Sequence, residues 1–339
     1  MKAGNSIKLS AAILITAVFC LILAGCFSSK AKQSAAEVAA PAKKYDIIRL
    51  ASPVDVVQTV NYWVGEELGF YEEEGIKLEY AGVVPSSQLV ASVVAGKLDI
   101  GGAHVNRTIA GISAGAKIKA VVADKETSEE VPHMVFVTRT DSPLRTAQDL
   151  VGKKIGISTN GGCHEYTPYA YMKKNGIEDP KSKVQIIVMP ETMMEQALRQ
   201  GEIDVAGMHR NPNQVGDQPE FRVMFHDYQI WGTIGGATPV YFTEKFIKEN
   251  PDLVRRFVRA TAKTNNWCNA NPDKAAEITA KRANIDPKTV KRTRYAPDGI
   301  IKDETVTVWI DLLRDFNEIK GDIKPAQIYT NEFNPYARN

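Results

Sequence analysis

Apolar runs that end abruptly in turn-forming residues recur along the chain. Residues 47–51 and 154–158 are runs of this kind, and serine, proline, asparagine or glycine follows each, as is typical of buried strands. Residues 86–95 and 191–200 instead space their apolar side chains three or four positions apart, which predicts amphipathic helices. This alternation predicts an α/β protein whose sheets are mainly parallel and flanked by helices.

The same pattern occurs twice, at a fixed offset of 105 residues. The matched positions are Gly96/Gly201, Asp99/Asp204, Ile100/Val205, Gly102/Gly207, His104/His209 and Asn106/Asn211. A repeated strand–helix–strand unit predicts two lobes of related structure. In the second copy, Thr192 and Glu195 also have the spacing of a helix capping box.

The second copy lies inside the first. Residues 133–140 and 236–243 resemble strands and bracket it, so we expect them to cross between the lobes. Glu249–Ala270 has a helical pattern, with Pro251 and Asp252 near its start. We therefore expect residues 45–135 and 239–339 to form the first lobe and 136–238 the second, joined by a two-strand hinge.

The N-terminus has the features of an export signal. Residues 1–25 carry Lys2 and Lys8 and then an apolar run that is too short to span a bilayer comfortably. The run ends in Leu-Ala-Gly-Cys26, which resembles the lipobox of bacterial lipoproteins and implies a lipidated Cys26. A soluble secreted protein with an incidental Cys26 and an uncleaved anchor are the alternatives. Residues 26–44, rich in Ser, Ala and Lys, are expected to form a flexible tether.

Charge and cysteine content limit which partners and which disulfide bonds can be expected. The formal net charge is +2, and Lys2 and Lys8 of the signal account for it, so the rest of the chain is neutral and nucleic acid is not an expected partner. Cys20 lies in the signal, which leaves Cys163 and Cys268 besides Cys26. Two cysteines about a hundred residues apart define no disulfide framework, and we expect them not to pair.

Four motifs carry a resemblance to a known family. They are Leu68–Ile76 (LGFYEEEGI), Ala95–Ile100 (AGKLDI), Asp149–Ile157 (DLVGKKIGI) and Gly201–Ala206 (GEIDVA). In order and spacing they resemble the nitrate, sulfonate and taurine type of ABC-transporter solute-binding proteins, whose relatives include thiamine-pyrimidine synthesis proteins. The resemblance covers residues 46 to about 280. It departs from the family at His209-Arg210-Asn211-Pro212, where relatives often read Trp-Glu-Pro.

The resemblance implies a two-lobed periplasmic-binding fold of type II, without a cofactor, that closes on a small ligand. It also implies delivery of that ligand to a permease and an ATPase, with the protein a monomer in the cell envelope. An enzyme is the first alternative, but the pyrimidine-forming relatives carry a cysteine-rich iron motif that this chain lacks. A sensor that presents itself to a membrane receptor is the second.

Ligands of open α/β sheets bind beyond the carboxyl ends of the strands, so the turns after each strand are the candidate site. The residues singled out are Ser52, Pro53, Ser86, His104, Asn106, Asn160, Gly161, Gly162, His164, His209, Arg210, Asn211 and Trp231. Glycines 161 and 162 before a helix permit close approach of an anion to free amide groups, although they also suit a plain tight turn. Arg210 suits a two-pronged contact with an anion, or a place on the surface.

The histidines and aromatic residues leave the ligand open. His104, His164 and His209 follow strands, but no partner stands at a metal-binding spacing, so we expect ligand contacts or turn structure and no metal. Tyr62, Trp63, Tyr166 and Trp231 suit stacking on a planar ligand or ordinary core packing. The glycine turn and Arg210 favour a small organic anion, and the aromatic residues favour a planar nitrogen heterocycle.

Overall fold

The computed structural model describes residues 44–53, 56–234 and 238–337. The predicted signal, Cys26 and the tether up to residue 43 lie outside them. Residues 43–339 form one compact unit. Among the described residues, no helix is both long and apolar enough to cross a membrane.

The described residues contain ten strands, which divide between two lobes as the repeat predicts. The first lobe contains β1 (Asp46–Ser52), β2 (Ile76–Val83), β3 (Gly101–Gly102), β4 (Ile118–Lys125) and β10 (Thr238–Thr243). The second contains β5 (Val135–Arg139), β6 (Lys154–Ile157), β7 (Gln185–Val188), β8 (Val205–Met208) and β9 (Phe221–His226), in the order β7-β6-β8-β5-β9. The two-lobed α/β fold is thereby confirmed.

Strand direction identifies the two crossings. β1 pairs with β2, and β6 pairs with β7 and β8, all in parallel. Every antiparallel pairing involves β5 or β10: β5 pairs with β8 and β9, and β10 pairs with β3 and β4. These are the strands at which the chain passes from one lobe to the other. The five-stranded sheet of the second lobe is mixed, whereas the first lobe has a parallel sheet of β1 and β2 and an antiparallel sheet of β3, β10 and β4.

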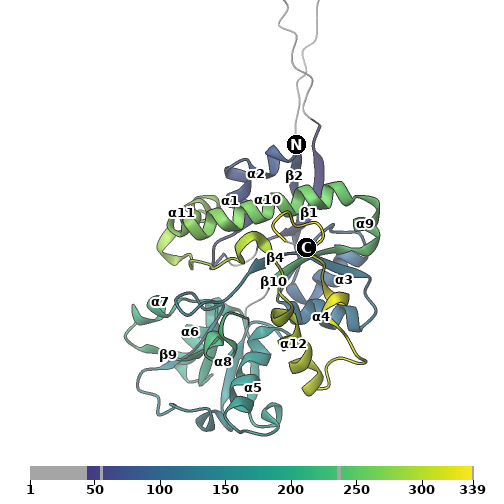
Figure 1. The fold of residues 1–339 in the computed structure, drawn as a ribbon. Coiled ribbons are helices and arrows are strands. Elements are labelled where there is room, and N and C mark those ends of the chain that lie inside the picture. Colours follow the sequence, from purple (N-terminus) through teal and green to yellow (C-terminus); the bar gives the residue numbers. More distant parts are fainter. Residues whose placement is uncertain (1–43, 54–55, 235–237, 338–339) are drawn as a thin grey trace, which may run out of the picture. The chain divides into compact units, whose positions relative to one another are not determined.

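The helices cover the sheets (Figure 1). In the first lobe they are α1 (Asn61–Glu67), α2 (Phe70–Glu73), α3 (Leu89–Val94), α4 (Val105–Ser113), α9 (Glu244–Glu249), α10 (Pro251–Ala270), α11 (Pro272–Ala283), α12 (Asp303–Asp315) and α13 (Pro325–Ile328). In the second they are α5 (Cys163–Lys174), α6 (Glu191–Gln200), α7 (Pro212–Gly216) and α8 (Asp227–Trp231). α10 packs on α1 and β4, which returns the C-terminal part to the first lobe.

Apolar cores lie within the lobes and also join them. Ile48, Val121 and Phe257 belong to a core that joins β1, β4 and α10, whereas Val135, Leu198 and Ala206 belong to one that joins β5, α6 and β8. A further cluster contains residues of both lobes, among them Val105 of α4 and Ile155 of β6. Burial of these side chains is the main favourable term in folding.

One local expectation is wrong. The capping box predicted at Thr192 does not form, because α6 already begins at Glu191 with Pro190 in the N-cap position and without a side-chain cap. A proline before the helix fixes the chain direction there, and Thr192 becomes an exposed residue of the first turn.

Candidate functional site

The matched strands place two histidines at equivalent positions. His104 follows β3 and is the N-cap residue of α4, and His209 follows β8 in the second lobe. The chain turns away from the sheet at both points, so both side chains lie at the carboxyl end of a strand, as expected.

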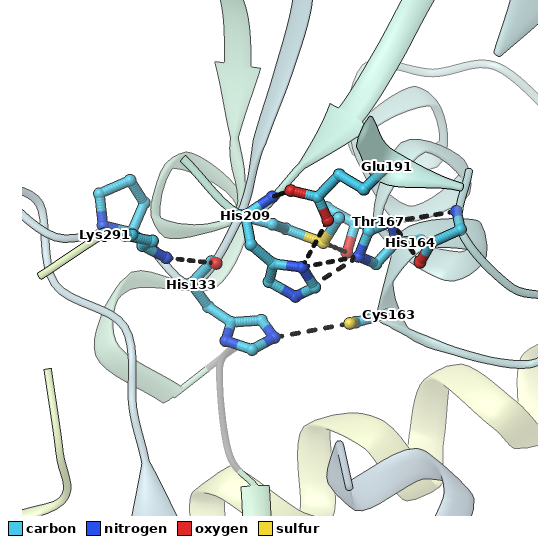
Figure 2. A network of polar contacts seen from close by, with 10 residues as sticks. His133, Cys163, His164, Thr167, Glu191, His209 and Lys291 are labelled. Carbon is cyan, nitrogen blue, oxygen red and sulfur yellow. Dashed lines mark hydrogen bonds and ion pairs between the residues drawn. The ribbon is translucent and has the colours of Figure 1, made fainter. Parts of the chain in front are cut away.

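Three further residues join them. His133 lies just before β5, and Cys163 and His164 are the first two residues of α5. The ligand atoms of His104, His133 and Cys163 all lie within 4.8 Å of one another, and so do those of Cys163, His164 and His209. We call His104, His133, Cys163, His164 and His209 the His–Cys cluster; Figure 2 shows four of them converging.

The contact between His164 and His209 is close but is not that of a good hydrogen bond, whereas the contact between Cys163 and His133 is within hydrogen-bond distance for sulfur. Cys163 Sγ lies 3.6 Å from His133 Nε2. His164 Nε2 lies 3.3 Å from Nδ1 and 3.4 Å from Nε2 of His209, so it faces the edge of the ring and not one acceptor. Normal N–H···N or N–H···O distances are shorter, about 2.7–3.2 Å.

Polar residues outside the cluster orient the rings. His209 Nδ1 donates to Glu191 Oε2 at 2.9 Å, while the other carboxylate oxygen accepts the His209 backbone N–H at 2.7 Å. His104 Nδ1 donates to Asn106 Oδ1 at 3.2 Å. Ser158 lies against His164 Nδ1, with its Oγ at 3.3 Å.

Burial keeps most of the cluster uncharged. It lowers the pKa of His133 well below the ordinary value, with His209 and His104 adding to the effect. It also lowers the pKa of His164 to about 3 and raises that of the Cys163 thiol to about 12. Burial alone would raise the pKa of Glu191, but His209 outweighs it and lowers that pKa to about 2. The site thus combines neutral imidazoles at His133 and His164, a thiol and one carboxylate.

A buried lysine supports the cluster from the first lobe. Lys291 Nζ donates to the backbone oxygens of Pro132 and His133, each at 2.7 Å (Figure 2). Burial lowers its pKa to about 8, partly offset by Asp227 and Glu191. These bonds fix the backbone that carries His133 at the first crossing between the lobes.

The predicted glycine turn is a contact between lobes. Asn106 Nδ2 donates to Gly161 O at 2.9 Å, and Arg107 Nη2 donates to Asn160 O at 2.6 Å. The Gly161 N–H donates to Glu165 Oε2 at 2.6 Å, so a carboxylate of α5 itself takes this amide. A Cβ added to Gly162 would lie 3.0 Å from Arg107 Nη2, so the glycine allows this close approach.

Beside this contact lies a cavity of 260 Å³. Its lining includes Ser86, Asn106, Arg107, Gly161 and Tyr166. Three of these, Ser86, Asn106 and Gly161, were predicted as ligand-binding residues. They come from both lobes, so the cavity is completed only when the lobes meet.

Two tryptophan rings pack together beside His104. The Trp231 and Trp309 rings are 4.9 Å apart between centroids, and Trp309 packs edge-on against His104 at 4.3 Å. Trp231 is thus connected to the cluster through Trp309. Of the other aromatic candidates, Tyr62 packs in the first-lobe core and Trp63 lies against Arg282.

The remaining candidates lie elsewhere. Ser52 ends β1 and pairs with Val83, and Pro53 follows it. Arg210 Nη2 contacts Glu195 Oε1 at 3.3 Å, and Asn211 is the N-cap residue of α7. Residues that the sequence did not single out for binding are His133, Cys163, Glu191, Arg107 and Trp309. The only sequence signal that could have drawn attention to His133 was the insertion of the second lobe, because it placed this residue at an expected crossing between the lobes.

Two α/β lobes joined by two crossing strands, with polar residues from both lobes at the strand ends, define the class of two-lobed ligand-binding proteins. A family model described as "NMT1/THI5 like" matches residues 57–275, more than half of the chain. The chain therefore belongs to the NMT1/THI5-like family.

Individual relatives agree with this assignment. The riboflavin-binding protein RibY of Chloroflexus aurantiacus is 24% identical over 291 residues, which cover 80% of this chain and 78% of RibY. The alkanesulfonate-binding protein SsuA of Xanthomonas axonopodis, solved with MOPS, has 14% identity and a TM-score of 0.66 over 84% of this chain and 98% of SsuA. The nitrate-binding protein NrtA of Synechocystis has 11% identity and a TM-score of 0.67, covering 86% and 87%.

The same fold also occurs in an enzyme. The desulfurization enzyme DSZB has 14% identity and a TM-score of 0.59, over 85% of this chain and 97% of that enzyme. At such identities the likeness concerns the fold, and function has to be argued from the site.

Proposed function

We propose that this chain is the extracytoplasmic solute-binding component of an ABC import system, a binding protein and not an enzyme. The observation that carries the proposal is the convergence of polar side chains from both lobes at the matched strand ends, His104 after β3 and His209 after β8. Family membership supports it, as do the neighbours named for sulfonate and nitrate binding.

Capture works by hinge closure. The bonds from Asn106 to Gly161 and from Arg107 to Asn160 join residues of different lobes, so opening at β5 and β10 breaks them. A solute that contacts both lobes stabilises the closed form and shifts the population toward it. The permease then recognises the closed shape and accepts the solute.

A small organic anion such as a sulfonate, nitrate or carboxylate is the proposed solute. Support comes from Arg107 in the wall of the 260 Å³ cavity, because guanidinium binds such groups through two parallel hydrogen bonds. This volume is slightly below the usual range of ligand pockets, about 300–1,000 Å³, and suits a small molecule.

A planar nitrogen heterocycle is the second candidate. Trp231, which is partly exposed and packs on the fully buried Trp309, offers an aromatic surface near the cluster, and the relative RibY is named for riboflavin binding. A sensor that presents its closed form to a membrane receptor would use the same site and differ only in its partner.

A thermal-shift screen of anions and heterocycles separates these candidates. We expect one class to raise the melting temperature by several degrees, since a ligand at 100 times its Kd adds about 2.7 kcal/mol of stability. Arg107→Gln should weaken an anion at least about tenfold, because a charge-assisted contact contributes about 1.5–3 kcal/mol. The control Arg139→Gln removes an exposed arginine that pairs with Asp141 and should leave binding unchanged.

Two results would contradict the proposal of a small organic anion as the solute. If heterocycles bind and Arg107→Gln binds them normally, the second candidate replaces the first. If the bound compound is recovered chemically altered, the protein is an enzyme and the binding proposal fails. Membrane attachment is tested separately by lipid labelling, which Cys26→Ala should abolish.

A further inference from the structure

Four of the five histidines of the chain meet in the His–Cys cluster, together with Cys163. They come from separate parts of the fold, namely the end of β3, the segment before β5, the start of α5 and the end of β8. His226, at the end of β9, is the fifth. Their meeting is therefore a product of the tertiary fold and not of neighbourhood in the sequence.

The spacing of the donor atoms suits a metal ion held by three ligands. The donor atoms of Cys163, His164 and His209 all lie within 4.8 Å of one another. Zinc–nitrogen bonds of about 2.0–2.1 Å place two nitrogens about 3.4 Å apart around a tetrahedral ion. The observed separation between His164 Nε2 and His209 Nε2 is 3.4 Å, which is longer than a normal direct hydrogen bond of about 2.7–3.2 Å.

The surroundings have the form of a metal site as well. Metal-bound histidines usually donate their second ring N–H to a carboxylate or another acceptor, which directs the free nitrogen at the metal. The Nδ1 of His209 donates to Glu191, which leaves its Nε2 without that proton and 3.4 Å from His164 Nε2. In His164, Nδ1 lies 3.3 Å from Ser158 Oγ and 3.4 Å from the Ser158 backbone N, so Nε2 is the ring nitrogen that faces the cluster.

We propose that Cys163, His164 and His209 form a binding site for a divalent transition-metal ion of the zinc, cobalt or nickel type, with a fourth coordination position open. Thiolate and imidazole are the donors that these ions prefer. On binding, the Cys163 thiol loses its proton to solvent and a sulfur–metal bond forms. The inference goes beyond organic solute binding and does not require it.

Cobalt(II) is the probe that tests the site. The self-contained unit from Lys43 onward, without a histidine tag and freed of metal by a chelator, is titrated with Co²⁺ and followed by absorption. We expect one ion per chain and a thiolate-to-cobalt charge-transfer band. Cys163→Ser should abolish the band and weaken binding at least about 100-fold, and His209→Ala should weaken it similarly.

Matched controls exist for both donor types. Cys268→Ser removes a buried thiol of another core, and His226→Ala removes the histidine outside the cluster, and both should bind Co²⁺ as wild type does within about twofold. Glu191→Gln keeps the ring contact but loses the carboxylate and should cost about 10- to 100-fold in affinity. Circular dichroism checks that each variant is folded.

The inference is overturned if no charge-transfer band appears, or if the Cys163 and Cys268 variants bind equally well. Solute binding measured with chelator present keeps the two proposals apart. An organic solute that still binds while cobalt does not would remove the metal site and leave the import function standing. Cobalt binding without binding of any organic solute would support the metal site and count against the import function.

Discussion

At the scale of single residues, the repeated aspartates explain why the two lobes resemble each other. Asp99 Oδ2 accepts the backbone N–H of Arg49 at 2.7 Å, and Asp204 Oδ2 accepts that of Lys154 at 2.8 Å. In return, each aspartate N–H donates to the backbone oxygen of the same strand residue at 2.9 Å. Each aspartate thus joins the end of a helix to a strand of its lobe, Asp99 to β1 and Asp204 to β6, and the repeated motif is structural.

Removing Asp99 should therefore be costly. Its carboxylate also accepts from Arg49 Nε and Nη2, and its side chain is only 10% exposed. We expect Asp99→Ala to lower the free energy of unfolding by about 3 kcal/mol, measured by urea denaturation. The exposed Asp141, paired with Arg139, is the control, and Asp141→Ala should cost less than about 1 kcal/mol. Equal costs would refute the structural role of Asp99.

The sequence identified only part of the site, for a physical reason. His104, His164 and His209 were recognisable because they follow strands, and parallel strands bring their carboxyl ends together. Cys163 was considered only as a disulfide candidate, and His133 only as part of a crossing strand. Metal-site rules rely on close spacing in the chain, whereas these donors meet through tertiary contacts.

At the scale of elements, the start of α6 shows where local motifs mislead. Thr192 and Glu195 have the spacing of a capping box with Thr192 as the N-cap residue, yet the N-cap residue of α6 is Pro190, two residues earlier, and the helix begins at Glu191. The carboxylate at that first position, Glu191, binds His209. The first residue of α6 therefore contacts the functional site, and the capping box that the sequence motif predicts does not form there.

The absence of a cap at Thr192 is testable against a real one. Thr243 Oγ1 accepts the backbone N–H of Phe246 at 3.1 Å and caps α9. Thr243→Ala should cost about 1 kcal/mol in unfolding free energy. Thr192→Ala should be neutral or slightly stabilising, because alanine is the better helix former. Thermal unfolding of both variants tests this expectation. A larger loss of stability in Thr192→Ala than in Thr243→Ala would show that the capping box does form.

At the scale of the whole molecule, the repeat made the fold predictable. Two copies offset by 105 residues, one inserted into the other, specified two lobes and two crossing strands. The pairing directions at the crossings could not be read in the same way, because they depend on where β5 and β10 insert into each sheet. Hydrophobic periodicity is local information, whereas strand order is not.

The pH dependence of stability should include a contribution from one buried carboxylic acid, Asp124. Asp124, at the end of β4, accepts from Asn61 Nδ2 at 2.6 Å, and burial raises its pKa from 3.8 to about 6. A raised pKa means that the folded state binds the proton more tightly than the unfolded chain does. The stabilisation from Asp124 is therefore full below about pH 4 and is lost as the pH rises to about 6.

Asp124→Asn isolates this contribution. We expect the stability of wild type relative to the variant to fall by up to about 3 kcal/mol between pH 4 and pH 6, measured by urea denaturation at each pH. Parallel pH profiles for the two proteins would show that Asp124 titrates normally in the fold.

The central claim is that a solute is held between the lobes. Mass spectrometry of the compounds released on denaturing the gently purified protein tests it most directly. The account predicts one small molecule in a fixed ratio to the chain, retained by Arg139→Gln and reduced in Arg107→Gln. Release of nothing, together with a screen in which no compound closes the lobes by X-ray scattering, would contradict it.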